Sequence, residues 1–475
     1  MRRTSSTAPC GPTVGVEEEF LLVDPVTGVA VNRAAEVVAI AREVFGLELE
    51  HELTGAQVET KTSVCRDAER VRRELRELRV SVARAAGEAG CRAIATGAPP
   101  LGDMAGEITD DLRYRRIARE FGALAAQQLI CGCHVHVAVP DRETAVQVCN
   151  HVRLWLPLLG AITANSPFSR GADTGFASWR SLVWSRWPVS GPPPFFASWQ
   201  HYQDTCATVL DAGTALDPAM IYWDVRPSAA WPTVEVRVAD VAASVDDAVL
   251  LAALVRALVT KASADVERGV EAVPVPVETL RQSCWRAARD GLSGHALDVL
   301  SGQLLPLRHQ LDVLLGQLKP VLAANGDLPL VRRGVRLLDR HGCGADRQRR
   351  AFRDGETQAL LDLIGLDAGD HPARGVVEVK MGSEVDMSNS DELERRCAEA
   401  LEAGAEEVVL DLSEVAFFGS SGITALDRIR AHGLEWGVPI SLVASATVAR
   451  MLHATAMDSL LPLRVRPETH LPTAG

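Results

Sequence analysis

The sequence lacks an apolar run long enough to cross a bilayer. Its best candidate, residues 249–260, contains Arg256 and is far shorter than the roughly 20 residues that a membrane span needs. The first residues, Met-Arg-Arg-Thr-Ser-Ser, lead toward proline and glycine and not into the apolar stretch of a secretion signal. We therefore expect a cytoplasmic protein with no membrane partner.

Lysine is almost absent as well. The chain has four lysines, Lys61, Lys261, Lys319 and Lys380, and no glycine-rich Walker A sequence. The formal net charge is −13, whereas nucleic-acid binding needs clustered lysine and arginine. These absences argue against nucleic acid as a partner. They also leave arginines and metal ions to neutralise charge at any site that handles phosphate.

The ten cysteines form no recognisable motif. Only Cys131 and Cys133 lie close together, and one intervening residue is not the spacing of a zinc knuckle or a thioredoxin-type motif. Because the chain is long and has no evident secretion signal, we expect reduced thiols that pack as small apolar side chains.

The chain is long enough for more than one hydrophobic core. It has 475 residues, of which 47% are hydrophobic and 23% charged, a composition typical of folded proteins. Residues 366–375 are small and polar and show no helical period, which predicts a linker. We therefore expect a large domain over residues 12–365 and a small one over 376–475.

Hydrophobic periodicity predicts an α+β fold for the large domain and an α/β fold for the small one. In the large domain we expect strands over 14–23, 57–61, 129–139 and 233–241, and helices over 67–86, 144–156, 245–264 and 305–324. In the small domain we expect strands over 376–380, 407–412 and 440–443, alternating with helices over 391–403, 421–432 and 447–455.

Charged residues recur on one face of the predicted strands. In Val14-Gly-Val-Glu-Glu-Glu-Phe, the two-residue period of a strand sends Glu17 and Glu19 to the same side. His134 and His136 share a side for the same reason. A solvated sheet face would also explain one such strand, but the pattern repeats along the chain.

The repetition favours a site for hard cations and phosphate. Glu235 and Arg237 alternate with valines in residues 233–241, and Glu59 is one of the alternating polar residues of 57–61. Carboxylate oxygens are the ligands that Mg²⁺ and Mn²⁺ prefer, and these ions bind more firmly when nucleotide phosphates complete their shell. The two nearby histidines leave a zinc site open as an alternative.

Arginines in an aromatic-rich region are candidates for binding a substrate carboxylate. Residues 164–199 combine glycine, proline and tryptophan, which predicts a long loop packed over a pocket. Arg170, Arg180 and Arg186 lie there, and Arg226 follows in Asp224-Val-Arg-Pro-Ser. Each could form a bidentate pair with a carboxylate. Each could instead only stabilise the packing of its own segment.

Six motifs occur in order over residues 12–365: Val14-Gly-Val-Glu-Glu-Glu-Phe, Cys133-His-Val-His-Val, Ala164-Asn-Ser-Pro-Phe with Asp173-Thr-Gly-Phe-Ala-Ser, Asp224-Val-Arg-Pro-Ser, Thr233-Val-Glu-Val-Arg-Val and Gly344-Ala-Asp-Arg-Gln-Arg. Together they resemble the carboxylate-amine ligases of the glutamate-cysteine ligase family 2. The resemblance implies a glutamine synthetase-type fold, in which an antiparallel sheet forms a funnel with ATP at one end and the amino acid at the other.

The resemblance also implies roles for individual residues. The implied ligands of Mg²⁺ or Mn²⁺ are Glu17, Glu19, Glu59, His134 and Glu235. Arg237 would lie near the γ-phosphate of ATP and act with Glu235 in catalysis, and Arg226 would assist in binding the nucleotide. We assign substrate binding to Arg170, Arg180 and Arg226.

The implied reaction joins a carboxylate to an amine. The γ-carboxylate of glutamate would attack the γ-phosphorus of ATP, and cysteine or another amine would displace phosphate from the acyl phosphate. No protein nucleophile is needed. Two alternatives remain: a metabolite sensor with a weakly active or inactive ligase body, and a guanidino kinase on the same type of fold.

The last hundred residues resemble a different family. Gly382-Ser-Glu-Val-Asp and the run Val408 to Leu426, which contains Phe418-Gly-Ser-Ser-Gly, are similar to the STAS domain of anti-sigma factor antagonists. The resemblance implies a regulatory domain whose first serine, here Ser420, is phosphorylated by a partner kinase. Gly419 stands where the family pattern has aspartate. A serine at this place could instead only cap the following helix.

Overall fold

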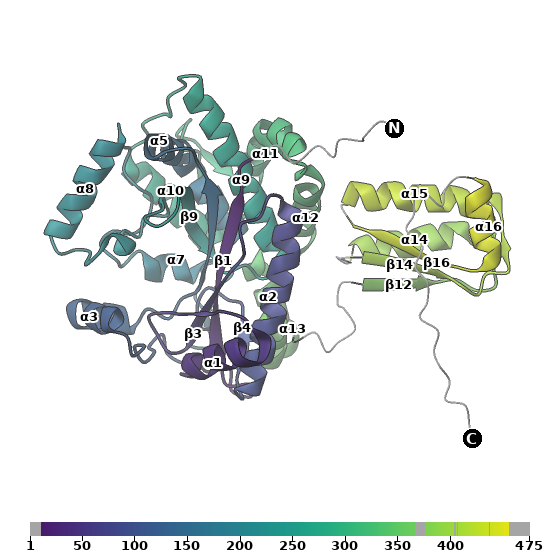
Figure 1. Ribbon diagram of the computed structural model, residues 1–475, viewed down its shortest axis with the longest axis horizontal. Coiled ribbons are helices and arrows are strands. Elements are labelled where there is room, and N and C mark those ends of the chain that lie inside the picture. Colours follow the sequence, from purple (N-terminus) through teal and green to yellow (C-terminus); the bar gives the residue numbers. More distant parts are fainter. Residues whose placement is uncertain are drawn as a thin grey trace. The chain divides into compact units, whose positions relative to one another are not determined.

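The computed structural model divides the chain into two compact units, Met1–Ala368 and Gly369–Gly475 (Figure 1). The structure describes residues 11–366, 368, 376–402, 405, 407–436 and 438–455. Most of the segment predicted as a linker, 366–375, lies outside the described residues.

A seven-stranded antiparallel sheet forms the centre of the large unit. Its strands are β1 (Val14–Val23), β2 (Glu50–His51), β3 (Gln57–Lys61), β4 (Arg92–Ile94), β5 (Gly132–Ala138), β8 (Val225–Pro227) and β9 (Thr233–Asp240). Their order is β2-β3-β1-β5-β9-β8, and β4 pairs with β1. The register sets Glu19 opposite Glu59 and Glu17 opposite His134. The α+β prediction is confirmed.

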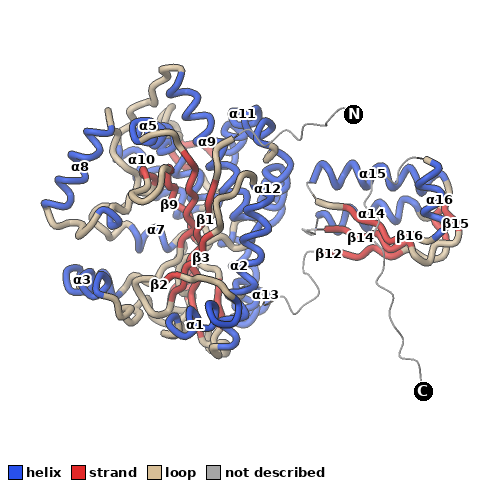
Figure 2. The backbone as a smooth tube through the Cα atoms, in the orientation of Figure 1, coloured by secondary structure: helices blue, strands red, loops and turns tan. Residues whose placement is uncertain are grey.

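Helices cover the apolar face of this sheet (Figure 2). The valines of β1, β5 and β9 that point to that face share one core with several helices, chief among them the largely buried α9 (Val245–Glu267). The other helices on this core are α2 (Ala68–Glu88), α5 (Arg142–Val152), α6 (Leu156–Ile162), α10 (Val277–Asp290), α11 (Leu307–Asn325) and α12 (Leu328–His341). Because the apolar side chains of each strand pack into this core, the side chains that alternate with them face the opposite side of the sheet.

The remaining elements of the large unit lie around the sheet and the helices that cover it. They are α1 (Ala34–Phe45), α3 (Leu112–Phe121), α4 (Ala123–Ala126), α7 (Trp179–Trp184), α8 (Trp199–Asp211), α13 (Gly344–Ile364), two 3₁₀ turns (Arg153–Trp155 and Pro218–Met220) and the short strands β6 (Phe168–Ser169), β7 (Ala172–Asp173), β10 (His295–Leu297) and β11 (Leu304–Pro306). Within the described part of the chain, no helix combines the length and the apolarity that a membrane span requires.

The helix expected over residues 144–156 is two helices. The α5 helix ends at Val152, a 3₁₀ turn follows, and α6 begins at Leu156 with Pro157 in its first turn. In a continuous helix the ring of Pro157 would clash with the carbonyl of Arg153. Proline is compatible with the first turn of a helix, and the chain therefore restarts there.

The third carboxylate of the Glu-Glu-Glu run points toward the helices. Glu18 is fully buried on the apolar side of β1, where Arg79 of α2 donates from Nε to Glu18 Oε2 at 2.9 Å. The second arm of the Arg79 guanidinium also reaches the carbonyl of Ala242 at 2.8 Å. This buried pair ties α2 to the strand that carries Glu17 and Glu19 on its other face.

The small unit has a parallel sheet with helices beside it. Its elements are β12 (Val376–Lys380), β13 (Glu384–Val385), α14 (Ser390–Glu402), β14 (Glu407–Leu412), β15 (Phe417–Phe418), α15 (Ser420–Trp436), β16 (Ile440–Ala444) and α16 (Ala446–Ala454). The main sheet has the order β12-β14-β16, and β13 pairs with β15. One apolar core unites these strands and helices. The α/β prediction is confirmed.

Removing one partner of the buried ion pair should destabilise the large unit. We expect Arg79→Leu to lower its free energy of unfolding by about 3–5 kcal/mol, because Glu18 would remain buried and unpaired. The double variant Glu18→Leu/Arg79→Leu should recover most of that loss. Denaturant unfolding followed by tryptophan fluorescence measures this unit, since all but one of the nine tryptophans lie in it. An unchanged midpoint for Arg79→Leu would contradict the assignment.

Candidate functional site

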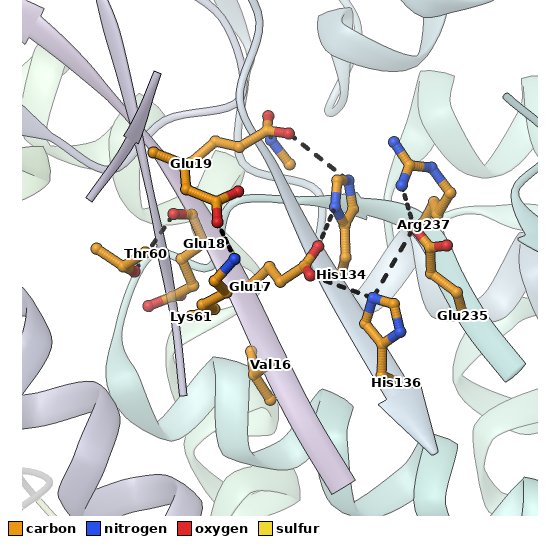
Figure 3. Close-up of polar contacts among 12 residues, drawn as sticks. Val16, Glu17, Glu18, Glu19, Thr60, Lys61, His134, His136, Glu235 and Arg237 are labelled. Atoms are coloured by element: carbon orange, nitrogen blue, oxygen red, sulfur yellow. Dashed lines mark hydrogen bonds and ion pairs between the residues drawn. The ribbon is translucent and has the colours of Figure 1, made fainter. Parts of the chain in front are cut away.

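A cleft of about 420 Å³ opens on the charged face of the sheet. The charged side chains that the strands β1, β3, β5 and β9 contribute to it are Glu17, Glu19, Glu59, His134, His136, Glu235 and Arg237. Figure 3 shows those of β1, β5 and β9 pointing toward one another from neighbouring strands. The period of the strands and the register of their pairing bring together residues that lie far apart in the sequence.

Glu17 lies between the two histidines. Its carboxylate is 3.2 Å from His134 Nδ1 and 3.3 Å from His136 Nε2. Burial would raise the pKa of Glu17, but hydrogen bonds and charge from His134 and His136 outweigh it and hold that pKa well below its usual range. Glu17 is therefore a carboxylate in contact with two imidazoles, a donor set suited to a divalent cation.

A second cluster, made only of carboxylates, lies in the same cleft. Glu19, Glu52 and Glu59 each offer an oxygen within 4.8 Å of the others. Burial, together with the charge of Glu19, raises the pKa of Glu52 to about 8. Burial and the charges of Glu52 and Glu17 raise the pKa of Glu59 well above its usual range. Carboxylates that crowd in this way retain protons unless a cation compensates their charge.

Glu235 is held between two arginines. Arg226 Nε donates to Glu235 Oε2 at 2.9 Å, and Arg237 contacts Glu235 Oε1. Burial opposes ionisation, but the charges of Arg237 and Arg226 hold the pKa of Glu235 well below its usual range. Arg237 lines the cleft, and its Nε is buried without a hydrogen-bond partner among the described residues.

Two site residues were missing from the predicted ligand set. Glu52 follows the short strand β2 and precedes a loop, so no strand period pointed to it. His136 was placed on the correct face but not counted as a ligand. Its Nδ1 lies 3.0 Å from Thr233 Oγ1, which orients Nε2 toward Glu17 and, at 4.0 Å, Glu235. The contact across β5 and β9 sets the orientation of this ring.

The arginines predicted to bind substrate are not all in the cleft. Arg170 lies in the turn between β6 and β7, is mostly exposed, and pairs with Asp103 at 3.2 Å, so its position does not support substrate binding there. Arg226 lines the cleft, but it also donates to the carbonyl of Ile221 at 2.6 Å and mainly positions Glu235. Arg180 is buried in the wall of the cleft.

Arg186 also lies in this region and donates to the carbonyl of Gln127 at 2.7 Å, which makes it part of the wall packing. Arg180 donates only long hydrogen bonds, of 3.3–3.4 Å, to the carbonyls of Arg237 and Val238, and its Nε has no partner among the described residues. Of the four candidates, Arg180 is therefore the one best placed to contact a bound substrate.

Other motif residues position the walls of the cleft. Asp240, at the end of β9, accepts hydrogen bonds from Asn165 N, Ser166 Oγ and Ser178 Oγ at 2.7–2.8 Å. This buried carboxylate therefore holds the loop that leads to α7 and Arg180.

The segment Gly344-Ala-Asp-Arg-Gln-Arg supports the same loop from α13. Arg349 donates to Asp173 at 2.8 Å, and Gln348 Nε2 reaches Asn165 Oδ1 at 2.7 Å. Gly344 is required here because a side chain on it would meet Asn165 at 2.1 Å. This motif thus fastens the helix to the loop and does not enter the cleft.

The ligand atoms fit divalent cations. In the part of the chain that the structure describes, three groups have donors within 4.8 Å of one another: Glu17, Glu59 and His134; Glu17, His136 and Glu235; Glu19, Glu52 and Glu59. Carboxylate oxygens dominate all three, which favours Mg²⁺ or Mn²⁺ over zinc. Glu17 and Glu59 each belong to two groups, so neighbouring cations could share them.

Comparison with known proteins matches both parts of the chain. The pattern of "Glutamate-cysteine ligase family 2" matches residues 13–363, and that of "STAS domain" matches residues 372–470. A protein of Nocardia farcinica named as glutamate–cysteine ligase 2-1 is 50% identical over 355 residues, 74% of this chain and 92% of the relative. A glutamate–cysteine ligase 2 of Salinispora arenicola is 46% identical over 361 residues, 76% of this chain and 96% of that relative.

Two solved structures share the fold of the large unit. One is a glutamate–cysteine ligase of Francisella tularensis in complex with AMP, with a TM-score of 0.56 at 12% identity, covering 74% of this chain and 87% of that one. The other is a bifunctional glutathione synthetase of Pasteurella multocida, with a TM-score of 0.56 at 15% identity. The match covers 74% of this chain and only 52% of the Pasteurella chain. The predicted glutamine synthetase-type fold is confirmed.

Loss of a shared ligand should weaken cation binding. We expect Glu59→Gln to reduce the affinity for Mn²⁺ at least ~10-fold, because Glu59 belongs to two of the three ligand groups. Electron paramagnetic resonance titration of the free ion measures the effect. Glu48→Gln, an exposed carboxylate on the segment before Glu52, is the matched control and should bind Mn²⁺ normally. Equal loss in both variants would refute a specific site.

Proposed function

The chain belongs to the glutamate-cysteine ligase family 2 and is an ATP-dependent ligase that forms carbon–nitrogen bonds, and from that premise we propose that it joins the γ-carboxylate of glutamate to an amine such as cysteine. The observation that carries the proposal is the cluster of Glu17, Glu19, Glu59 and Glu235 with two histidines and Arg237 in one cleft.

The proposed reaction proceeds in two transfers. An oxygen of the glutamate γ-carboxylate attacks the γ-phosphorus of ATP, which breaks the bond to the β-phosphate bridging oxygen and releases ADP. The amine nitrogen then attacks the acyl carbon, phosphate leaves, and the nitrogen loses a proton as the amide forms. Positioning and charge neutralisation supply the catalysis, as is usual for phosphoryl transfer.

The residues of the cleft would have different roles in this reaction. Glu17, Glu19, Glu52, Glu59, His134, His136 and Glu235 would hold Mg²⁺ or Mn²⁺, which when bound neutralises the charge of the triphosphate. Arg237 extends from β9 beside Glu235 and lines the cleft, a position that suits contact with the transferred phosphoryl group. Arg226 fixes the orientation of Glu235. Arg180 lies in the wall of the cleft, where it would contact a substrate carboxylate.

We propose a regulatory role for the STAS domain. Ser420 opens α15 and is exposed, and a helix N-terminus favours the negative charge of a phosphate. A side chain at Gly419 would meet its nearest neighbour, the carbonyl of Val385, only at 3.5 Å, so the fold does not exclude the family's aspartate there. The partner would be a serine kinase of the anti-sigma factor type, in the cytoplasm.

Turnover should require all substrates together. With ATP and Mg²⁺, we expect sustained ADP release over many turnovers only when L-glutamate and a suitable amine are both present, and a product whose mass equals glutamate plus amine minus water. Screening cysteine and other amines by coupled ADP assay and mass spectrometry identifies the co-substrate. A phosphorylated guanidino product would instead favour the kinase alternative. Substrate binding without turnover for every amine would favour the sensor.

Glu235→Gln should abolish turnover and leave the fold intact. The amide keeps the size and some hydrogen bonds of Glu235, but it removes the charge that faces two arginines and the cation site. We expect a loss of at least ~10²-fold in kcat, in line with removal of one charged group from a catalytic site. Circular dichroism checks folding, and Glu48→Gln should retain full activity. An active Glu235→Gln enzyme would disprove the assigned role.

Phosphorylation should occur at the first of the two serines. We expect phosphopeptide mapping of the chain, isolated from its host, to show phosphate on Ser420, and none in a Ser420→Ala variant. Ser421→Ala is the matched control and should still be phosphorylated. If Gly419 impairs kinase recognition, Gly419→Asp will increase the modified fraction. Phosphate confined to Ser421 would contradict the proposal.

A further inference from the structure

A second cavity, of about 450 Å³, lies beside the cation cleft. It is lined by residues of α6, α7 and α10 and by the segment before β8. Arg180, Trp184 and Trp187 line both spaces and thus form a shared wall. The volume is within the range of sites for small molecules, about 300–1,000 Å³.

Asp224 is the buried acid of this cavity. Its side chain lies among the cavity's lining residues, and the residue is only 7% exposed. The main chain fixes it, since Asp224 N donates to Gly191 O at 2.9 Å and Arg237 N donates to Asp224 O at 2.8 Å. Within residues 11–366, however, no hydrogen bond or ion pair reaches its carboxylate. The carboxylate lines the cavity, where a donor group of a ligand could pair with it.

The lining of this cavity also contains arginines. Arg281 of α10 lines it, is exposed, and makes no ion pair or hydrogen bond with any described residue. Of the other two arginines in the lining, Arg186 donates to the carbonyl of Gln127, and Arg180 makes only long hydrogen bonds to main-chain carbonyls. Burial raises the pKa of Asp224 to about 6, and the charges of Arg180, Arg237 and Arg281 oppose that rise. One unpaired acid and one unpaired base therefore face the same space.

Between these charges the cavity is aromatic and apolar. Trp184, Trp187 and Trp285 line it together with Leu156 and Val238. The indole N–H groups of Trp184 and Trp187 are buried and have no acceptor among the described residues. Indole rings offer apolar surface at one edge and a donor at the other. The walls thus suit a ligand with an apolar body.

We propose that this cavity binds an apolar α-amino acid, with its ammonium group on Asp224, its carboxylate on Arg281 and its side chain against the three tryptophans. A zwitterion satisfies both unpaired charges at once, whereas a simple amine would leave Arg281 unpaired and a simple acid would leave Asp224 unpaired. Resting on the proposed ligase function, the assignment makes the amine co-substrate an amino acid held next to the wall of the cation cleft.

Calorimetric binding to the full-length protein tests the site with three probes. L-phenylalanine carries both charges, phenethylamine lacks the carboxylate, and 3-phenylpropanoate lacks the ammonium group. We expect saturable binding of L-phenylalanine, and at least ~10-fold weaker binding of each of the other two, because each leaves one charge of the cavity unsatisfied. Equal affinity for all three would show apolar packing alone and would overturn the proposal.

Two variants assign each end of the ligand. Asp224→Asn should weaken L-phenylalanine at least ~10-fold and leave 3-phenylpropanoate unchanged, since that probe has no ammonium group. Arg281→Gln should weaken L-phenylalanine and leave phenethylamine unchanged. Arg289→Gln, on the same helix but outside the cavity lining, is the matched control and should bind all three normally. Unaltered binding of L-phenylalanine by Asp224→Asn and Arg281→Gln would also overturn the proposal.

A cleft variant separates this site from the ligase assignment. Glu59→Gln lines only the cation cleft and should bind L-phenylalanine like the unaltered protein even if it has lost turnover. Adding apolar amino acids to the ADP assay then shows the role. A γ-glutamyl product identifies the co-substrate, and a changed rate without such a product identifies an effector at the same site. Loss of L-phenylalanine binding in Glu59→Gln but not in Asp224→Asn would place the ligand in the cleft and reject the cavity.

Discussion

The structure depends on the two-residue alternation of its central strands. In β1, β5 and β9, valines on one face pack against the helices, and this packing leaves the charged side chains no direction other than the opposite face. Burial of apolar surface thus supplies the free energy that confines several carboxylates in a small space, against their mutual repulsion. Burial, together with the charges of the neighbouring carboxylates, raises the pKa values of Glu52 and Glu59.

Much of the fold and part of the site could be predicted from sequence. Strand periodicity indicated the shared faces of Glu17 and Glu19 and of His134 and His136, because alternation is a local property of the chain. Which strands are neighbours is not local, and the pairing of Glu17 with His134 became evident only from the register. Glu52 was missed for the same reason, since it lies beyond any periodic segment and reaches the cleft through tertiary packing.

Residue type alone also did not distinguish residues that could bind a substrate from residues that stabilise the fold. Arg170 and Arg180 were equal candidates in the sequence, yet one lies in an exposed turn and the other in the wall of the cleft. The motif residues around Asn165 and Arg349 hold the loop that leads to α7 and Arg180, and they do not contact the cleft. Asp224, which lies in a recognised motif, is distinguished only by the absence of a described partner for its buried side chain. The hydrogen-bond and ion-pair partners of a side chain become evident only from the three-dimensional structure.

The run of three glutamates also limits how the chain can assemble. Glu18 needs Arg79, whereas its two neighbours need the open face. A shift of β1 by one residue would carry two carboxylates into the valine core and leave Arg79 without an acid, a penalty that no other contact of the strand could recover. The triplet therefore disfavours a one-residue shift of β1 during assembly, because the shifted strand would bury carboxylates that have no partner.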